Sequence, residues 1–141
     1  MKRYIIFLAL STFVLADGES IYKNKCASCH EYYVPAESLM DNFMNHKNKK
    51  LNLKAPTINQ LNFRLKQMIG EPKGDLEFHR AEVTEFIKSY LISPDKQKSV
   101  CLLEVINSFE TMKSMKNELN SKELDEISNW IYDYKQPKDK K

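Results

Sequence analysis

The chain has 141 residues, which is enough for one domain with its own core. Its 22 basic and 19 acidic side chains give a formal net charge of +3, too balanced for the strongly basic field that marks nucleic-acid binding. Three cysteines are too few for a framework of several disulfides.

Residues 1–16 have the pattern of a secretory signal peptide. Lys2 and Arg3 form a basic start, an apolar run follows from Tyr4 to Leu15, and the small residue Ala16 suits a cleavage site. The apolar run is short for a bilayer span, so a retained membrane anchor is the weaker alternative. We expect cleavage after Ala16, export to the periplasm, and no stable membrane span in the mature chain.

A helix predicted from about Gly18 to Cys29 leads into the stretch Cys26-Ala27-Ser28-Cys29-His30. C-x-x-C-H is the attachment signature of a c-type haem, because two thiols can bond the two vinyl groups of one porphyrin and the adjacent histidine can ligate the iron. A thioredoxin-like pair would need a βαβ pattern and a zinc site would need further ligands, and the sequence offers neither. We expect one covalent haem c per chain, held by Cys26 and Cys29, with His30 as the proximal iron ligand.

Two helices and a polar loop are predicted next. The first helix covers Ser38 to Met44, and the second begins at about Pro56 and ends at Gly70. Lysine and asparagine crowd the loop from His46 to Lys54, which we interpret as a solvated loop or, alternatively, as a docking patch for an acidic redox partner. Three methionines of this region are interpreted as core residues: Met40, Met44 and Met68.

Two more helices are predicted in the middle of the chain. Asp75 can cap a helix from about Leu76 to Leu91, and the turn Ser93-Pro94-Asp95 begins another, from about Lys96 to Phe109. Cys101 lies in the second of these between apolar neighbours. We expect it to be a small buried apolar residue, and a disulfide between chains or an approach to the iron is the alternative.

The last predicted helix begins at a capping box, Asn120-Ser121-Lys122-Glu123, and runs to Tyr134. Trp130 on this helix is expected to pack against Tyr22, and a hydrogen bond to a haem propionate is the alternative. Residues 137–141 are interpreted as a frayed tail. No strand or repeat is predicted, so residues 17–136 are expected to form one all-α domain.

The two ends of the mature chain resemble class I cytochromes c. The pattern G-x-x-x-Y-x-x-x-C-x-x-C-H, from Gly18 to His30, resembles the first helix and haem motif of that family, in which the glycine allows close approach of the last helix. The segment Phe109 to Lys116 resembles the loop that supplies the methionine ligand. The resemblance implies a cytochrome c-like fold around one haem, with extra helices inserted between the haem motif and this loop.

The same resemblance implies the remaining site residues. Met112 is the expected distal iron ligand, with Met115 and His79 as alternatives, although His79 is more simply a packed or surface residue. Lys113 stands where many relatives have a proline that stiffens the loop. The resemblance also implies that the carbonyl of Pro56 accepts a hydrogen bond from His30.

These features predict a single-electron carrier that works with redox partner proteins and is not an enzyme. A haem-based sensor or ligand-binding protein, or a weak peroxidase, is the alternative if the sixth iron position is open or easily displaced. A docking subunit of a respiratory complex is a third alternative, in which the inserted helices bind the larger assembly.

Overall fold

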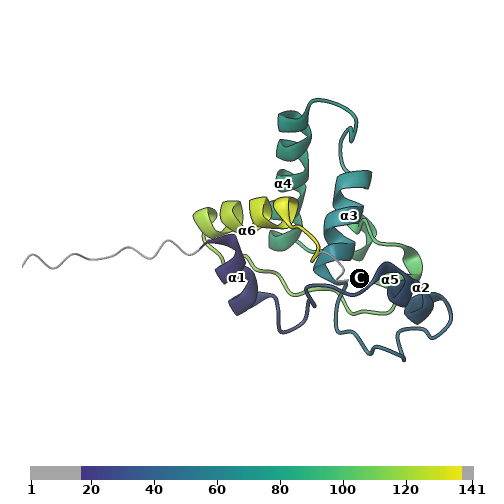
Figure 1. Ribbon diagram of the computed structural model, residues 1–141. Coiled ribbons are helices and arrows are strands. Elements are labelled where there is room, and N and C mark those ends of the chain that lie inside the picture. The colour runs from purple at the N-terminus through teal and green to yellow at the C-terminus, as the bar shows by residue number, and fades with distance from the viewer. Residues whose placement is uncertain (1–16, 138–141) are drawn as a thin grey trace, which may run out of the picture.

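A computed structural model describes residues 17–137 of the chain, which contain six α-helices and one short 3₁₀ helix (Figure 1). The helices are α1 (Gly18–Lys25), α2 (Ala36–Met44), α3 (Ile58–Met68), α4 (Leu76–Ile92), η1 (Lys96–Lys98), α5 (Leu103–Ile106) and α6 (Ser121–Asp133). No residue in this part of the chain lies in a strand, which confirms the all-α prediction. None of these helices is long and apolar enough to cross a membrane. The predicted signal peptide, and the tail beyond Pro137, lie outside the described residues.

Helices α1 and α6 pack against each other and bring the two ends of the described chain together (Figure 1). Gly18 permits the contact, because a Cβ at this position would overlap Cβ of Trp130 and lie 2.5 Å from the carbonyl oxygen of Glu126. The rings of Trp130 and Tyr22 lie next to each other, with centroids 4.6 Å apart. The predicted packing of these two aromatic residues is therefore confirmed.

Side-chain caps define the starts of the two longest helices, α4 and α6. The Asp75 carboxylate accepts a 2.9 Å hydrogen bond from the backbone of Phe78 at the start of α4, as predicted. Both halves of the capping box are present in α6, since the Asn120 side chain bonds the backbone N–H of Glu123 and the Glu123 carboxylate bonds that of Asn120. Gly70, with a φ of +62°, follows the end of α3.

The main core is built around α6, which packs against α1, α3 and α4. Its buried side chains are Ile21, Tyr22, Ile58, Leu65, Val83, Ile87, Leu91, Leu119, Leu124, Ile127, Ile131 and Tyr132. A second apolar cluster joins α2 to α5 and contains Leu39, Phe43, Leu53, Cys101, Val105, Ile106 and Phe109. Cys101 is thus a buried apolar residue, as expected.

The predicted helix from Lys96 to Phe109 is wrong. Only η1 and α5 are helical there, and the backbone between them is extended at Ser99 and Leu102. Two hydrogen bonds support the break: the Arg64 side chain on α3 donates to the carbonyl of Val100, and the backbone of Cys101 donates to the Ser99 hydroxyl. A tertiary hydrogen bond and a local side-chain hydrogen bond thus take the place of helical backbone hydrogen bonds in this segment.

The prediction that three methionines fill the core is also wrong. Met40, Met44 and Met68 are 55, 43 and 55 % exposed. Helix α2 buries Leu39 and Phe43, which are four residues apart and therefore lie on one face. Met40 and Met44 are each one position further along the helix and lie outside that face.

Candidate functional site

The residues of the C-x-x-C-H motif form a turn at the end of α1. The helix ends at Lys25, earlier than the predicted Cys29. The backbone N–H groups of Cys29 and His30 both donate to the carbonyl of Cys26, at 3.0 and 2.9 Å. The chain therefore closes on itself within the motif, and both cysteines and the histidine belong to one compact turn.

Hydrogen bonds from Tyr22 and Ile58 hold this turn in place. The Tyr22 hydroxyl donates to the carbonyl of His30 at 2.6 Å, and the ring is only 1 % exposed. Burial, followed by the nearby Cys26, raises the pKa of Tyr22, so the phenol keeps its proton and remains a donor. Ile58, the first residue of α3, donates its N–H to the carbonyl of Glu31 at 2.8 Å and holds the other end of the turn.

The His30 ring makes one hydrogen bond, from Nδ1 to the carbonyl oxygen of Pro56, at 2.7 Å. A carbonyl can only accept, so Nδ1 carries the proton and Nε2 is the nitrogen with the free lone pair. Within the described part of the chain, Nε2 has no hydrogen-bond partner. Burial lowers the pKa of His30, and the bond to Pro56 only partly opposes this effect. The ring is thus held in the neutral, single-tautomer form that a metal ligand requires.

The two motif cysteines are free, with Cys26 half-buried and Cys29 exposed. Burial, and then the proximity of Cys29, raises the pKa of Cys26 to about 11. Cys26 is therefore a protonated thiol at neutral pH. Redox-active C-x-x-C pairs rely on the opposite shift, toward a thiolate, so this environment does not favour a thioredoxin-like role.

The loop between α5 and α6 contains both candidate methionine ligands. Met115 donates its N–H to the carbonyl of Leu91 at 2.8 Å, and its own carbonyl accepts from Glu118 and Leu119. Lys25, at the end of α1, donates to the carbonyl of Glu118 at 2.7 Å and so ties this loop to the turn that begins at Cys26.

Met112 lies in a less constrained part of the same loop. Its backbone forms no hydrogen bond with another residue in the range 17–137, in contrast to that of Met115. Both methionines are half-buried and pack against the main core cluster, and Cys26 packs against the same cluster. The structure thus brings Met112, Met115 and Cys26 to one core.

His79 is not part of this arrangement. It is 6 % exposed, and its Nδ1 lies 3.1 Å from the hydroxyl of Tyr132 in α6. It lies in the first turn of α4. His79 is a packed residue here, and its Nε2 has no partner among the described residues.

Sequence reasoning missed one contact of the site. It assigned Tyr22 only to packing against the last helix and did not anticipate the hydroxyl bond to His30. A signal was present, because a buried tyrosine needs a partner for its hydroxyl. The described residues contain no cluster of three His, Cys, Asp or Glu side chains that could hold a bare metal ion. The donors at the turn, two thiols and one imidazole nitrogen, fit a haem attached through sulfur.

Comparison with known proteins identifies a distant homologue. An uncharacterized protein of Aquifex aeolicus (strain VF5) is 29 % identical over 140 aligned residues, which cover 94 % of this chain and 87 % of that protein. No family model matches the chain. No solved structure matches it either.

Proposed function

We propose that this protein is a monohaem c-type cytochrome of the periplasm that carries single electrons between redox partner proteins. The observation that carries the proposal is the His30 ring, whose Nδ1–H donates to the Pro56 carbonyl, so that Nε2 keeps its lone pair free within a C-x-x-C-H turn. The resemblance of this segment to class I cytochromes c implies the same bond. A redox dithiol alone would give the histidine no comparable role.

The residues that would hold the haem are those of the turn. The thiols of Cys26 and Cys29 would each add across one vinyl group, so that each sulfur gains a carbon bond and its proton moves to the vinyl carbon. His30 would bind the iron through Nε2. When bound, the haem supplies an iron that gains and loses one electron.

Two contacts would keep the proximal ligand in place. The Pro56 carbonyl fixes the orientation of the His30 ring and increases the electron density on Nε2. Tyr22 holds the backbone of the same residue. Ring and backbone are therefore both restrained, which limits the rearrangement that accompanies a change in oxidation state.

Met112 is the proposed distal ligand. A ligating side chain must adjust to the iron, and among the described residues the backbone of Met112 has none of the hydrogen bonds that fix Met115. Lys113 does not add the stiffness of a proline, so the loop remains adaptable on this side. Methionine ligation would raise the reduction potential and close the iron to external ligands.

The experiment is to express the chain with its own N-terminus in a bacterium that matures c-type cytochromes, then to record spectra during a redox titration. We expect a reversible one-electron transition, a six-coordinate haem in both states, and the weak red band of methionine-ligated ferric iron. Met112→Ala should lose this band and bind carbon monoxide when reduced. Met115→Ala is the matched control and should retain it.

Three other outcomes would contradict or change the proposal. A wild-type protein that binds carbon monoxide readily when reduced would contradict the carrier proposal and support the ligand-binding alternative. Loss of the band in Met115→Ala and not in Met112→Ala would move the ligand to Met115. Absence of covalent haem would overturn the proposal as a whole.

A further inference from the structure

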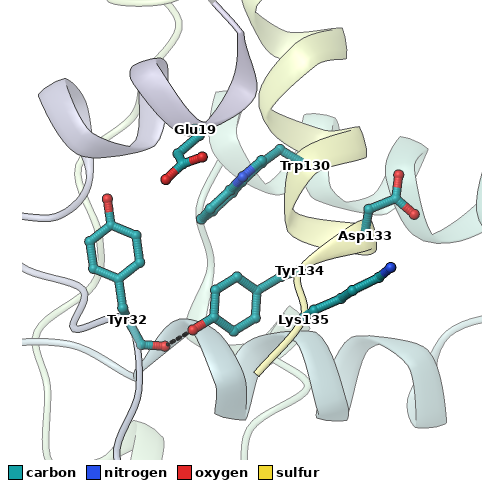
Figure 2. A pocket seen from close by; sticks show the side chains of 6 residues that line it. All are labelled: Glu19, Tyr32, Trp130, Asp133, Tyr134 and Lys135. Carbon is teal, nitrogen blue, oxygen red and sulfur yellow. Dashed lines mark hydrogen bonds between the residues drawn. The ribbon is translucent and has the colours of Figure 1, made fainter. Parts of the chain in front are cut away.

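A pocket of about 270 Å³ lies where α1, the loop after the C-x-x-C-H turn and the end of α6 meet (Figure 2). Its lining residues are Glu19, Tyr32, Trp130, Asp133, Tyr134 and Lys135. This volume is slightly below the range of about 300–1,000 Å³ that is typical of sites for drug-sized ligands. The pocket therefore suits a small head group.

Three aromatic rings form a corner around this space. The centroids of Tyr32 and Trp130 are 6.3 Å apart with an interplanar angle of 89°, and those of Trp130 and Tyr134 are 5.5 Å apart at 63°. Rings at such angles line adjacent walls, whereas parallel rings would stack and close the space between them. Figure 2 shows the three side chains around the same space, two of them from α6 and the chain that follows it.

The corner is held in place without a ligand. The Tyr134 hydroxyl donates to the carbonyl of Tyr32 at 2.7 Å, a bond that is drawn in Figure 2. Buried Tyr22 contacts Trp130 and Tyr32 from the core side, with centroids 4.6 and 4.7 Å away. Binding of a ligand would therefore cost little side-chain conformational entropy.

The charge of the pocket is negative on the side of Glu19. Its carboxylate points toward the space between Tyr32 and Trp130 (Figure 2), and it forms no hydrogen bond or ion pair with another residue in the described range. Its proximity also contributes to the raised pKa of Tyr32, after burial.

The other two charged residues of the lining are Asp133, which pairs with Arg80, and Lys135. Asp133 receives two hydrogen bonds from the guanidinium of Arg80, at 2.6 and 2.9 Å. Lys135 is close enough to contribute to the lowered pKa of Asp133, although Arg80 is the main cause. The charges of Glu19, Asp133, Arg80 and Lys135 sum to zero, but in Figure 2 the Asp133 carboxylate and the Lys135 ammonium point away from the three aromatic rings. Glu19 is therefore the charged group that faces the aromatic corner.

From this combination we infer that the pocket binds an alkylated ammonium group, such as a trimethylammonium head group. Aromatic faces and a free carboxylate both attract a cation. An alkylated ammonium is weakly hydrated and loses little water on entry, whereas a primary ammonium must leave three hydrogen bonds to water. This inference is independent of the proposed haem chemistry.

The test is a calorimetric titration of the purified, full-length protein with tetramethylammonium chloride at constant ionic strength. The indole N–H signal of Trp130 serves as a second readout, because the chain has one tryptophan. We expect saturable binding with a dissociation constant on the order of 1 mM and a shift of the indole signal, as a few cation–π contacts would give. The uncharged isostere tert-butanol and methylammonium should each bind about fivefold or more weakly.

Two carboxylate variants make the test specific. Glu19→Gln should weaken tetramethylammonium binding about three- to fivefold, and it removes no hydrogen bond or ion pair among the described residues. Glu77→Gln is the matched control, because Glu77 is also exposed and lies in the first turn of a helix, α4. Absence of saturable binding, equal binding of tert-butanol, or equal effects of the two variants would each overturn the inference.

Discussion

At the scale of single residues, the environment of His30 is the best-defined chemical feature of the protein. Its ring is fixed by Pro56, and its carbonyl by Tyr22. Tyr22 lies in the helix that leads into the motif, and Pro56 lies 26 residues after His30, so the geometry of the motif depends on one nearby and one distant segment. The histidine is therefore oriented by the fold before any ligand is attached.

Replacing Tyr22 with phenylalanine tests the backbone restraint. The ring packing against Trp130 should survive, but the carbonyl of His30 would lose its donor, whereas that of Glu31 would keep the bond from Ile58. We expect the free energy of unfolding to fall by about 1–3 kcal/mol, because a part-buried acceptor is left unpaired. Denaturant unfolding measures this loss. Tyr90→Phe is the control, since the Tyr90 hydroxyl bonds no residue in the described range, and an equal loss in both variants would contradict the assignment.

The residues of the proposed haem site could be predicted to different degrees. Cys26, Cys29 and His30 could be predicted because the spacing of the C-x-x-C-H motif is specific for haem attachment. Pro56 could be predicted only from the family resemblance. The aromatic pocket was not predicted, because Glu19, Tyr32 and Tyr134 do not form a sequence motif. They meet only where α1, the loop after the C-x-x-C-H turn and the end of α6 pack together.

At the scale of elements, the packing of α1 against α6 depends on the absence of a side chain at Gly18. The neighbouring atoms belong to Trp130 and to the backbone of Glu126, and backbone cannot move aside at low cost. The family resemblance implied a close approach of the last helix at Gly18, and the structure shows that approach.

Gly18→Ala should destabilise the protein by about 1–3 kcal/mol, the usual cost of inserting a methyl group into a closely packed contact. Thermal unfolding monitored by circular dichroism would show the loss. Gly74→Ala provides the comparison, because the nearest atom to its added Cβ would be 3.2 Å away. If the two variants had the same stability, the close approach at Gly18 would be refuted.

Asp41 in α2 is expected to contribute to the stability of the protein in acid. Hydrogen bonds from Asn45 and then Lys50 lower the pKa of Asp41 from 3.8 to about 2. The ionised carboxylate therefore stabilises the fold above about pH 3.8, and this contribution is lost as the pH falls toward 2. Asp41→Asn should reduce the steepness of acid unfolding in that window.

The control for Asp41→Asn is Glu37→Gln on the same helix, whose carboxylate is exposed and has no partner among the described residues. Acid titration followed by circular dichroism would compare the two. Equal slopes for wild-type protein and Asp41→Asn between pH 3.8 and 2 would rule out the proposed contribution.

Helices with strong local signals were predicted well, and those governed by distant contacts were not. The start of α4 and both ends of α6 were predicted to within a residue, because caps and apolar spacing determine them. The helix expected from Lys96 to Phe109 is broken by Arg64, which bonds the carbonyl of Val100 from another element. Local spacing contains no information about such a partner.

At the scale of the whole molecule, the predicted insertion is not a peripheral addition. Helix α4 contributes Val83, Ile87 and Leu91 to the main core and packs along α6. The other segment predicted to be inserted, α5, instead joins α2 in the second cluster. The segment predicted to be an insertion is therefore divided between the two cores.

The central claim is that Cys26 and Cys29 attach one haem to this chain, and the mass of the intact, denatured protein tests it most directly. Protein purified from a host that matures c-type cytochromes should be heavier than the processed polypeptide by one haem, and the haem should resist acid extraction. Cys26→Ala combined with Cys29→Ala should abolish the increase, whereas Cys101→Ala should not. A wild-type mass equal to that of the polypeptide alone, under conditions in which a control cytochrome matures, would contradict the account.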